Sequence, residues 1–170
     1  MPKNGSEHSE TAAIFKQTGF SGKIALILGT WFGSGLAPVA PGTFGTLAAA
    51  PLVALSAILS PLVSALFLII MTLVAIWASQ VVQNLLERVD PPEVVIDEVA
   101  GFLLTMLFIP LSWGTFAVGF VLFRIFDIWK PWPAKAAERL HGGLGIVLDD
   151  LVAGLYGNLG LRLALCFGSF

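Results

Sequence analysis

The chain has 170 residues, of which 56% are hydrophobic and 12% are charged, and its mean hydropathy is +0.88. Soluble domains carry about 25% charged residues, so this composition indicates a lipid-facing surface. The net charge of −2 provides no basic field for nucleic acid, and the single Cys166 excludes an internal disulfide and a cysteine zinc cluster.

The first residues form a polar arm ahead of the apolar part of the chain. Residues 1–22 contain several charged side chains, and the basic region is not followed directly by an apolar core with a small-residue cleavage site, as in a signal peptide. We therefore expect a disordered or loosely attached arm that stays on the protein. A single helical membrane domain is expected over residues 23–170.

No charged residue occurs between Lys23 and Glu87. A single helix over this stretch would be about 95 Å long, far more than the roughly 30 Å of a bilayer core, so the chain has to fold back. Glycines and prolines at 33–43 and the Ser60-Pro61 step supply two breaks. They leave three apolar segments that we predict to be helical, near 24–32, 44–59 and 62–86.

Charged connections and apolar helices alternate in the second half of the chain. Residues 87–98 form a charged connection, and two short helices are expected over 99–110 and 113–123. Residues 124–143 are polar again, and a last apolar helix is expected from near Ile146. Strand-like alternation is missing from the sequence. We therefore predict an all-α fold, a compact bundle of about six helices that is membrane-embedded or interfacial.

The distribution of charge also predicts orientation. Lys3, Lys16 and Lys23 favour a cytoplasmic N-terminal arm. If the successive apolar helices form hairpins, each charged connection returns to the same side. We therefore expect the charged segments to converge at the cytoplasmic face of the membrane.

Asp97 and Glu98 stand at the start of a predicted helix. Acidic residues are favoured there because the helix macrodipole is positive at its N-terminus, and this alone would explain the pair. The alternative is a metal site, since hard cations such as Mg²⁺ take carboxylate oxygens.

Arg124, Asp127 and Lys130 follow one another at a spacing of three. On a helix they lie on one side, among large apolar neighbours. A salt-bridged surface is the simplest explanation, but the apolar surroundings favour a polar site. Arg and Lys suit phosphate oxygens. Asp127, ionised between two cations, could hold a metal or orient Arg124.

A glycine-rich turn precedes the acidic pair Asp149 and Asp150. A turn of this kind at a helix start suits anions. Neighbouring residues on a helix point about 100° apart, so we expect only one of the two to face a site directly. His141, beside the turn, is either a proton shuttle or, more commonly for a lone histidine, a structural or solvated group.

A second glycine-rich segment, GLAPVAPGTFGT, covers residues 35–46. A turn with threonine capping is the simple explanation. A phosphate cradle formed by Gly42, Thr43, Gly45 and Thr46 is the functional one. Acids, cations and two glycine-rich helix starts on one predicted side suit Mg²⁺-assisted phosphoryl chemistry.

Four ordered motifs over residues 33–157 resemble those of the phosphatidylglycerophosphatase A family: GLAPVAPGTFGT, DEVAG, FRIFDIWKPWP and HGGLGIVLDDLVAG. The departures are mild, with Thr46 where Ser is expected and Val147 where Met is common. The resemblance implies a helical, Mg²⁺-dependent phosphatase of the bacterial inner membrane, and the distribution of charge predicts that its active site faces the cytoplasm. Its substrate would be phosphatidylglycerophosphate, a phospholipid in the bilayer, which it would convert to phosphatidylglycerol and phosphate.

The motifs and the resemblance together assign roles to residues. The predicted catalytic residues are Asp97, Asp127, Asp149 and Asp150. The predicted metal ligands are Asp97, Glu98, Asp127, Asp149 and Asp150. The predicted substrate-binding residues are Arg124, Lys130, Gly42, Thr43, Gly45 and Thr46. The attacking group is either a metal-activated water or an aspartate, through an aspartyl-phosphate.

A small membrane transporter or channel is the alternative, in which membrane-embedded acids and Arg162 mark an ion path. Most charges lie at the ends of the predicted helices, which favours the enzyme. Arg162 lies inside the last helix, where it either reaches an interface or pairs within the bundle. Lipid phosphatases that use a phosphohistidine need paired histidines, and the sequence has only His8 and His141.

Overall fold

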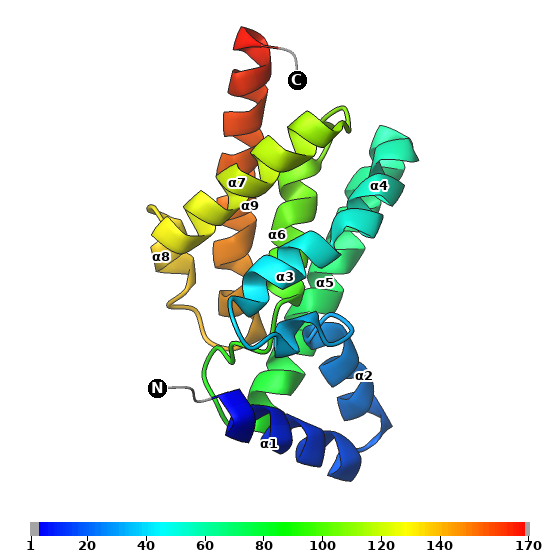
Figure 1. Ribbon diagram of the computed structural model, residues 1–170, viewed down its shortest axis with the longest axis vertical. Coiled ribbons are helices and arrows are strands. Elements are labelled where there is room, and N and C mark those ends of the chain that lie inside the picture. Colours follow the sequence, from blue (N-terminus) through cyan, green and yellow to red (C-terminus); the bar gives the residue numbers. More distant parts are fainter. Residues whose placement is uncertain (1–3, 169–170) are drawn as a thin grey trace.

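The computed structural model describes residues 4–168, with side chains from Glu10 onward. Helices and short connections make up this part of the chain, with no strand in it, which confirms the predicted all-α fold (Figure 1). In chain order the elements are α1 (Asn4–Gln17), α2 (Phe20–Gly29), the 3-10 turn η1 (Ser34–Leu36), α3 (Pro41–Ala48), α4 (Ala50–Ile58), α5 (Pro61–Leu86), α6 (Ile96–Met106), α7 (Trp113–Trp129), the short α8 (Ala134–Ala137) and α9 (Gly143–Phe167).

Local sequence signals set where several helices begin and end. Pro41 and Pro61 occupy the first positions of α3 and α5, where the missing N–H costs nothing. Ser112 caps α7 by accepting from the backbone N–H of Thr115, 3.0 Å away. At the other end of α7 the chain turns at Lys130, which has a left-handed φ of 46°.

Several helix boundaries differ from the prediction. The helix expected over 44–59 starts at Pro41 and divides at Ala49 into α3 and α4. Residues 124–129, expected in a polar connection, extend α7, and α9 begins at Gly143 rather than near Ile146.

The N-terminal arm, expected to be disordered or loosely attached, forms helix α1. Helix α1 packs against α2 and α5, and Glu10 forms an ion pair with Arg88 at the end of α5. These tertiary contacts stabilise a segment whose polar sequence gives no apolar stripe. Residues 1–3 of the predicted arm lie outside the described residues.

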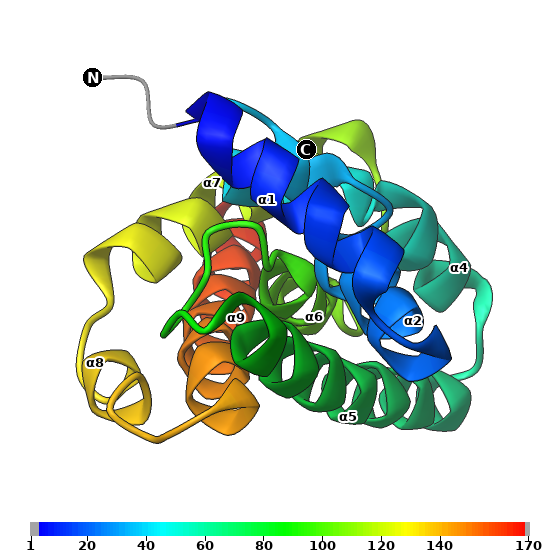
Figure 2. The same cartoon turned by 90° about the horizontal axis from the view of Figure 1, so that it is seen from below.

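Helix α9 is the centre of the bundle and packs against α5, α6, α7 and α8. Figure 2 shows α6 and α9 in the middle, with α5 along one side and α8 at another. Two glycines bring α6 and α9 into backbone contact. A Cβ at Gly101 would lie 2.6 Å from the backbone oxygen of Asp150, and one at Gly154 would collide with the backbone of Gly101.

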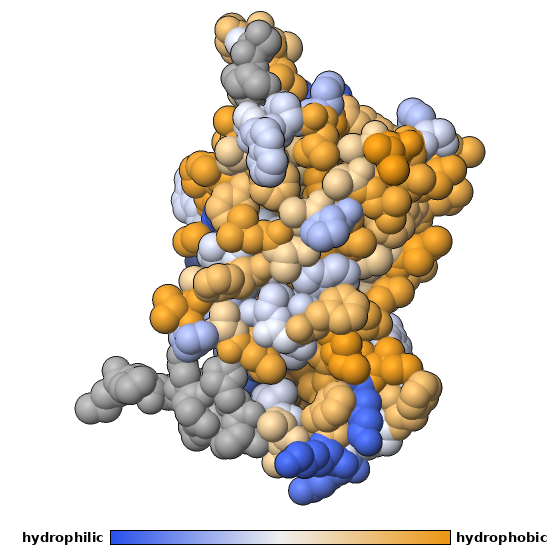
Figure 3. All heavy atoms as spheres, turned by 45° about the vertical axis from the view of Figure 1, so that its right-hand side comes forward, coloured by the Kyte–Doolittle hydropathy of each residue, from blue (hydrophilic) through white to orange (hydrophobic). Residues whose placement is uncertain are grey.

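Much of the outer surface is apolar. Among the described residues, three helical stretches are long and apolar enough to cross a membrane: Pro41–Ile58, Pro61–Leu86 and Gly143–Phe167. Leu62, Ile70 and Leu73 of α5 are largely exposed. On the face seen in Figure 3, apolar side chains dominate and the most hydrophilic ones gather at the lower end. This surface indicates a membrane-associated protein.

Helices α6 and α9 both start in the lower half of Figure 1, towards the end of the molecule where α5 finishes, and residues from the charged connections line one cavity. The charged connections therefore converge, as the sequence predicted. The side of the membrane that they face stays a prediction.

Helix α6 has 11 residues and stops well short of a full span. Its last carbonyls are satisfied by α9. Asn158 Nδ2 donates to the carbonyls of Leu104, Thr105 and Leu107 at 3.2, 2.9 and 2.9 Å. Arg162 donates from Nε to Asn158 Oδ1 at 2.8 Å and from Nη2 to the Leu107 carbonyl at 3.3 Å. Arg162 thus pairs within the bundle and completes this cap.

Replacing Asn158 by Leu should destabilise the bundle, because it removes the side-chain donor of the buried Thr105 carbonyl and the acceptor of Arg162 Nε. We expect a loss of about 2 kcal/mol in the free energy of unfolding, measured by denaturation in detergent micelles. The matched change Asn84→Leu, on an exposed position of α5, should stay within about 0.5 kcal/mol. Equal stability of the two variants would contradict the capping role.

Candidate active site

A cavity of about 220 Å³ lies where the starts of α6 and α9 meet the end of α7. We call it the acid cavity. It is lined by residues from four parts of the chain: Pro41, Gly42, Asp90, Pro91, Pro92, Val94, Asp97, Glu98, Asp127, Lys130, Asp149 and Asp150. Every acidic residue predicted for the site lines it.

Three of these acids form a tight group. Asp97, Glu98 and Asp150 each offer a carboxylate oxygen, and the three oxygens lie within 4.8 Å of one another. One buried oxygen of each residue (Asp97 Oδ1, Glu98 Oε2, Asp150 Oδ2) has no hydrogen-bond partner among the described residues. Buried carboxylates without partners are costly unless a cation or a proton compensates them. The group therefore fits a hard divalent cation, which takes carboxylate oxygens.

The convergence of these acids follows from a five-residue pattern that occurs twice. Residues 97–101 read DEVAG and residues 150–154 read DLVAG. Asp97 and Gly101, like Asp150 and Gly154, are four residues apart and so lie one above the other on their helices. Because the two glycines are the backbone contact between α6 and α9, the acids one turn earlier face each other. The recurrence is the sequence signal for this pairing, and the motifs taken singly did not show it.

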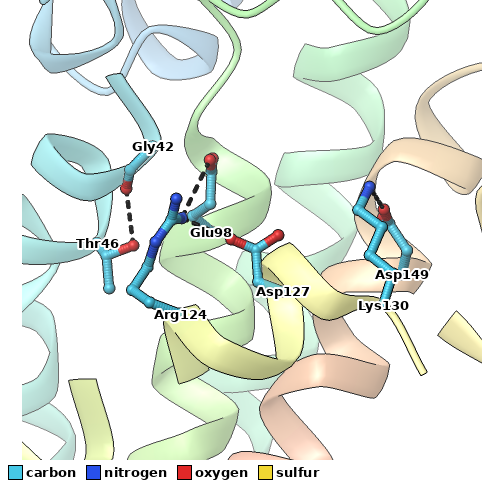
Figure 4. Close-up of polar contacts among 7 residues, drawn as sticks. All are labelled: Gly42, Thr46, Glu98, Arg124, Asp127, Lys130 and Asp149. Atoms are coloured by element: carbon cyan, nitrogen blue, oxygen red, sulfur yellow. Dashed lines mark hydrogen bonds and ion pairs between the residues drawn. The ribbon is translucent and has the colours of Figure 1, made fainter. Parts of the chain in front are cut away.

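Arg124 reaches into the acid group from α7 (Figure 4). Its Nη1 lies 2.6 Å from Asp127 Oδ2 and 3.7 Å from Glu98 Oε1. The i, i+3 spacing of Arg124 and Asp127 puts them on one side of the helix, as predicted. Arg124 Nε is buried and has no hydrogen-bond partner in the described part of the chain, so a donor remains for a ligand.

Lys130 pairs with the second aspartate of α9. Its Nζ lies 2.5 Å from Asp149 Oδ2 and 3.6 Å from Glu138 Oε1. Burial lowers the pKa of Lys130, but the hydrogen bond and charge of Asp149 outweigh it and raise the pKa above its usual value. Asp149 and Asp150 thus point in different directions. Asp150 joins the acid group, and Asp149 holds the lysine.

The glycine-threonine segment contributes through its backbone rather than its hydroxyls. Gly42 is the member of the predicted cradle that lines the cavity. A Cβ there would collide with Glu98 Oε1 and lie 3.0 Å from Arg124 Nη1. Thr46 is fully buried and donates to the Gly42 carbonyl at 2.7 Å. Gly45 packs on Val95, and Thr43 does not line the cavity.

Asp90 is a cavity residue that the sequence analysis missed. It lies in the connection between α5 and α6, with a left-handed φ of 50°. Burial raises its pKa, while Lys130 acts in the opposite sense. The Asp-Pro-Pro sequence resembles any helix-ending connection, so nothing in it singled out this carboxylate. His141 lies outside the acid cavity.

The metal-free acid group holds protons tightly. Burial raises the pKa of Asp97 well above its usual value, and the charges of Glu98 and Asp150 raise it further. Burial also raises the pKa of Glu98 to about 7, against the opposing effects of Asp97 and Arg124. A cation bound here has to displace these protons.

Residues 27–165 match the sequence profile of phosphatidylglycerophosphatase A. The chain belongs to the phosphatidylglycerophosphatase A family. A phosphatidylglycerophosphatase A of Escherichia coli is 38% identical over 131 residues, which cover 76% of this chain and 76% of the relative. One from Haemophilus influenzae is 37% identical over 133 residues, covering 76% and 82%.

A further relative, from Bacteroides thetaiotaomicron, is provisionally named a phosphatidylinositol-3-phosphatase and is 36% identical over 141 residues, covering 78% of this chain and 88% of that protein. No solved structure matches the chain. Family membership makes the chain an enzyme, a phosphatase that acts on a phosphomonoester. The transporter alternative loses its main support as well, because Arg162 is occupied in the cap of α6.

Cation binding should strengthen as the pH rises. Below pH 7 Glu98 is protonated in the metal-free protein, so each bound cation has to release at least one proton. We expect the Kd for Mn²⁺ to fall by about tenfold or more from pH 6 to pH 8, by calorimetry. Glu98→Gln should flatten this dependence, whereas Glu87→Gln, at an exposed position, should leave it unchanged.

The raised pKa of Glu98 also predicts how the stability of the metal-free protein changes with pH. Unfolded Glu98 loses its proton near 4.5 and folded Glu98 near 7, so metal-free stability should fall as the pH rises through this window. Saturating Mn²⁺ should reverse the trend. Equal Kd values for Mn²⁺ at pH 6 and pH 8 would contradict a site in which cation binding releases protons.

Gly42→Ala should disable the site while leaving the fold intact. The added methyl group pushes on Glu98 and Arg124 together, and small displacements of positioned groups are costly for catalysis. We expect phosphatase activity to fall by about tenfold or more, with unchanged helix content by circular dichroism. Gly160→Ala, where the nearest neighbour is at an ordinary 3.4 Å, is the control and should retain activity.

Proposed function

We propose that this protein is a Mg²⁺-dependent phosphatase that hydrolyses phosphatidylglycerophosphate to phosphatidylglycerol and phosphate at the cytoplasmic face of the bacterial inner membrane. The observation that carries the proposal is the acid group, three carboxylate oxygens within 4.8 Å, beside a half-buried arginine whose buried Nε is an unused donor. The names of two relatives supply the substrate.

In this proposal Asp97, Glu98 and Asp150 hold the cation, since they carry the oxygens without partners. Asp127 and Asp149 line the same cavity and complete the predicted ligand set. Asp127 also forms an ion pair with Arg124, and Asp149 forms one with Lys130. Mg²⁺, when bound, would polarise the phosphoryl group and offset its negative charge.

Arg124 and Lys130 bind the phosphomonoester. The buried Nε of Arg124 can donate to a phosphate oxygen while Asp127 keeps the guanidinium in place. Lys130, anchored by Asp149, lines the cavity as a point charge. Gly42 lets the backbone of α3 come close to the reacting group. Positioning and charge neutralisation of this kind account for most catalysis in phosphoryl transfer.

The aromatic side chains around α7 support a site at the membrane interface. Trp129 and Trp132, at the end of α7 that carries Lys130, are 71% and 81% exposed. Trp113, at the opposite end, is 92% exposed. Exposed tryptophans favour the two interfaces of a bilayer, so the acid cavity would lie at headgroup level, where a diacyl lipid presents its phosphate.

The substrates named by the relatives share one chemical unit. In phosphatidylglycerophosphate the glycerol carries a phosphodiester, a hydroxyl and a phosphomonoester on three successive carbons. In phosphatidylinositol 3-phosphate, positions 1, 2 and 3 of the ring carry the same three groups in the same order. We infer that this phosphodiester–hydroxyl–phosphomonoester unit is the substrate class of the protein.

Phosphate release from short-chain phosphatidylglycerophosphate in mixed micelles tests the function. We expect release with Mg²⁺ and none after EDTA, with recovery when Mg²⁺ is restored. Asp97→Asn, Asp127→Asn and Asp150→Asn should each lower kcat by about 100-fold or more.

The exposed substitution Glu87→Gln serves as the control and should keep full activity. Folded wild-type protein that releases no phosphate in the presence of Mg²⁺ would refute the proposal. Full turnover in Asp127→Asn would remove that residue from the catalytic set.

A further inference from the structure

A second cavity, of about 470 Å³, adjoins the acid cavity. Asp90 and Asp149 line both cavities and so form the boundary between them. On its far side the second cavity is lined by Arg139 and His141, from the connection between α8 and α9. Apart from Asp149 at the boundary, no member of the proposed catalytic set lines this space.

The 139–143 connection, which forms this side of the second cavity, packs against α5. The backbone N–H of Gly143 donates to Gln80 Oε1 at 3.0 Å. Gly142 has a φ of 74°, and a Cβ on it would collide with the Gln80 side chain. The 139–143 connection is therefore held at a defined position beside the cavity.

The charges around this cavity leave one cation available. Two of its acids, Glu138 and Asp149, are both paired with Lys130. Arg139 forms no ion pair with any residue from Glu10 to Gly168 for which the structure gives side chains. Its guanidinium is therefore free to meet an anionic ligand in a planar, two-pronged geometry.

The volumes of the two cavities suit different parts of the substrate headgroup. The volume of the acid cavity is that of roughly seven water molecules in the liquid. This is enough for a phosphate group with its cation. The rest of a glycerol or inositol headgroup needs additional space, and the adjoining cavity is about twice as large.

We propose that this second cavity is the subsite for the remainder of the headgroup: Arg139 binds the phosphodiester, and Asp90, at the boundary, accepts a hydrogen bond from the hydroxyl between the two phosphates. This inference rests on the proposed function. Arg139 lines the second cavity, Asp90 lines both cavities and the acid group lines the first. The phosphodiester, the hydroxyl and the phosphomonoester of the substrate would meet these residues in that order. The same subsite would therefore accept a glycerol and an inositol headgroup. It also gives the missed Asp90 a role in specificity.

Inhibition by the two reaction products tests the subsite separately from the acid cavity. Phosphatidylglycerol keeps the glycerol and the phosphodiester but lacks the phosphomonoester, whereas inorganic phosphate mimics only the group in the acid cavity. With Arg139→Gln we expect the inhibition constant of short-chain phosphatidylglycerol to rise by about tenfold or more. The inhibition constant of inorganic phosphate should not change.

Lys135→Gln is the matched control. It removes one positive charge from an exposed position of α8 that lines neither cavity, so a general effect of charge on lipid binding would appear in both variants. Equal inhibition of wild type and Arg139→Gln by phosphatidylglycerol would overturn the subsite. If wild type released no phosphate from phosphatidylglycerophosphate, the proposed function itself would fail, so the two failures are distinguishable.

The role of Asp90 is tested with a substrate analogue that carries propane-1,3-diol in place of the headgroup glycerol. Wild type should turn over the analogue with kcat/KM lower by about tenfold. Asp90→Gly, which tolerates the left-handed backbone, should treat the two substrates alike. Unchanged discrimination in Asp90→Gly would remove Asp90 from the proposal.

Discussion

The structure depends on a group of carboxylates that cannot all stay buried and charged on their own. Asp97, Glu98 and Asp150 share one small space, and each has an oxygen without a protein partner. Burial penalises such charges by several kcal/mol unless they are compensated. The protein supplies only part of the compensation, through Arg124. What remains is a group that could hold a cation, or protons when no cation is bound.

The bundle is arranged to hold this unfavourable group in place. Gly101 and Gly154 bring α6 and α9 into backbone contact one turn from the acids. Within a membrane, small residues permit such close approach and helix ends still need partners. Helix α6 is short, and Asn158 and Arg162 donate to carbonyls at its end and just beyond it. A half-length helix with acids at its start and a side-chain cap at its end thus presents its N-terminus to the acid cavity.

Sequence reasoning found the parts of the site but not all of their partners. Charge-free segments and prolines predicted most helices, because burial in lipid and missing N–H groups act locally. The 100° step between neighbouring residues indicated that Asp149 and Asp150 would diverge. Helix α1 was missed because tertiary pairing through Arg88 stabilises it. Asp90 was missed because its place depends on how the connection folds. Thr46 was expected to face substrate, whereas its hydroxyl bonds to its own helix.

Metal-directed cleavage tests the central claim, that segments far apart in the sequence converge on one cation, most directly and without an activity assay. Fe²⁺ would replace Mg²⁺, and ascorbate with peroxide would generate radicals at the bound ion. The account predicts backbone cuts near residues 41–42, 90–98, 127–130 and 149–150, all suppressed by excess Mg²⁺ and lost in Asp150→Asn. Cuts confined to other segments, or cuts that Mg²⁺ and Asp150→Asn leave unchanged, would contradict it.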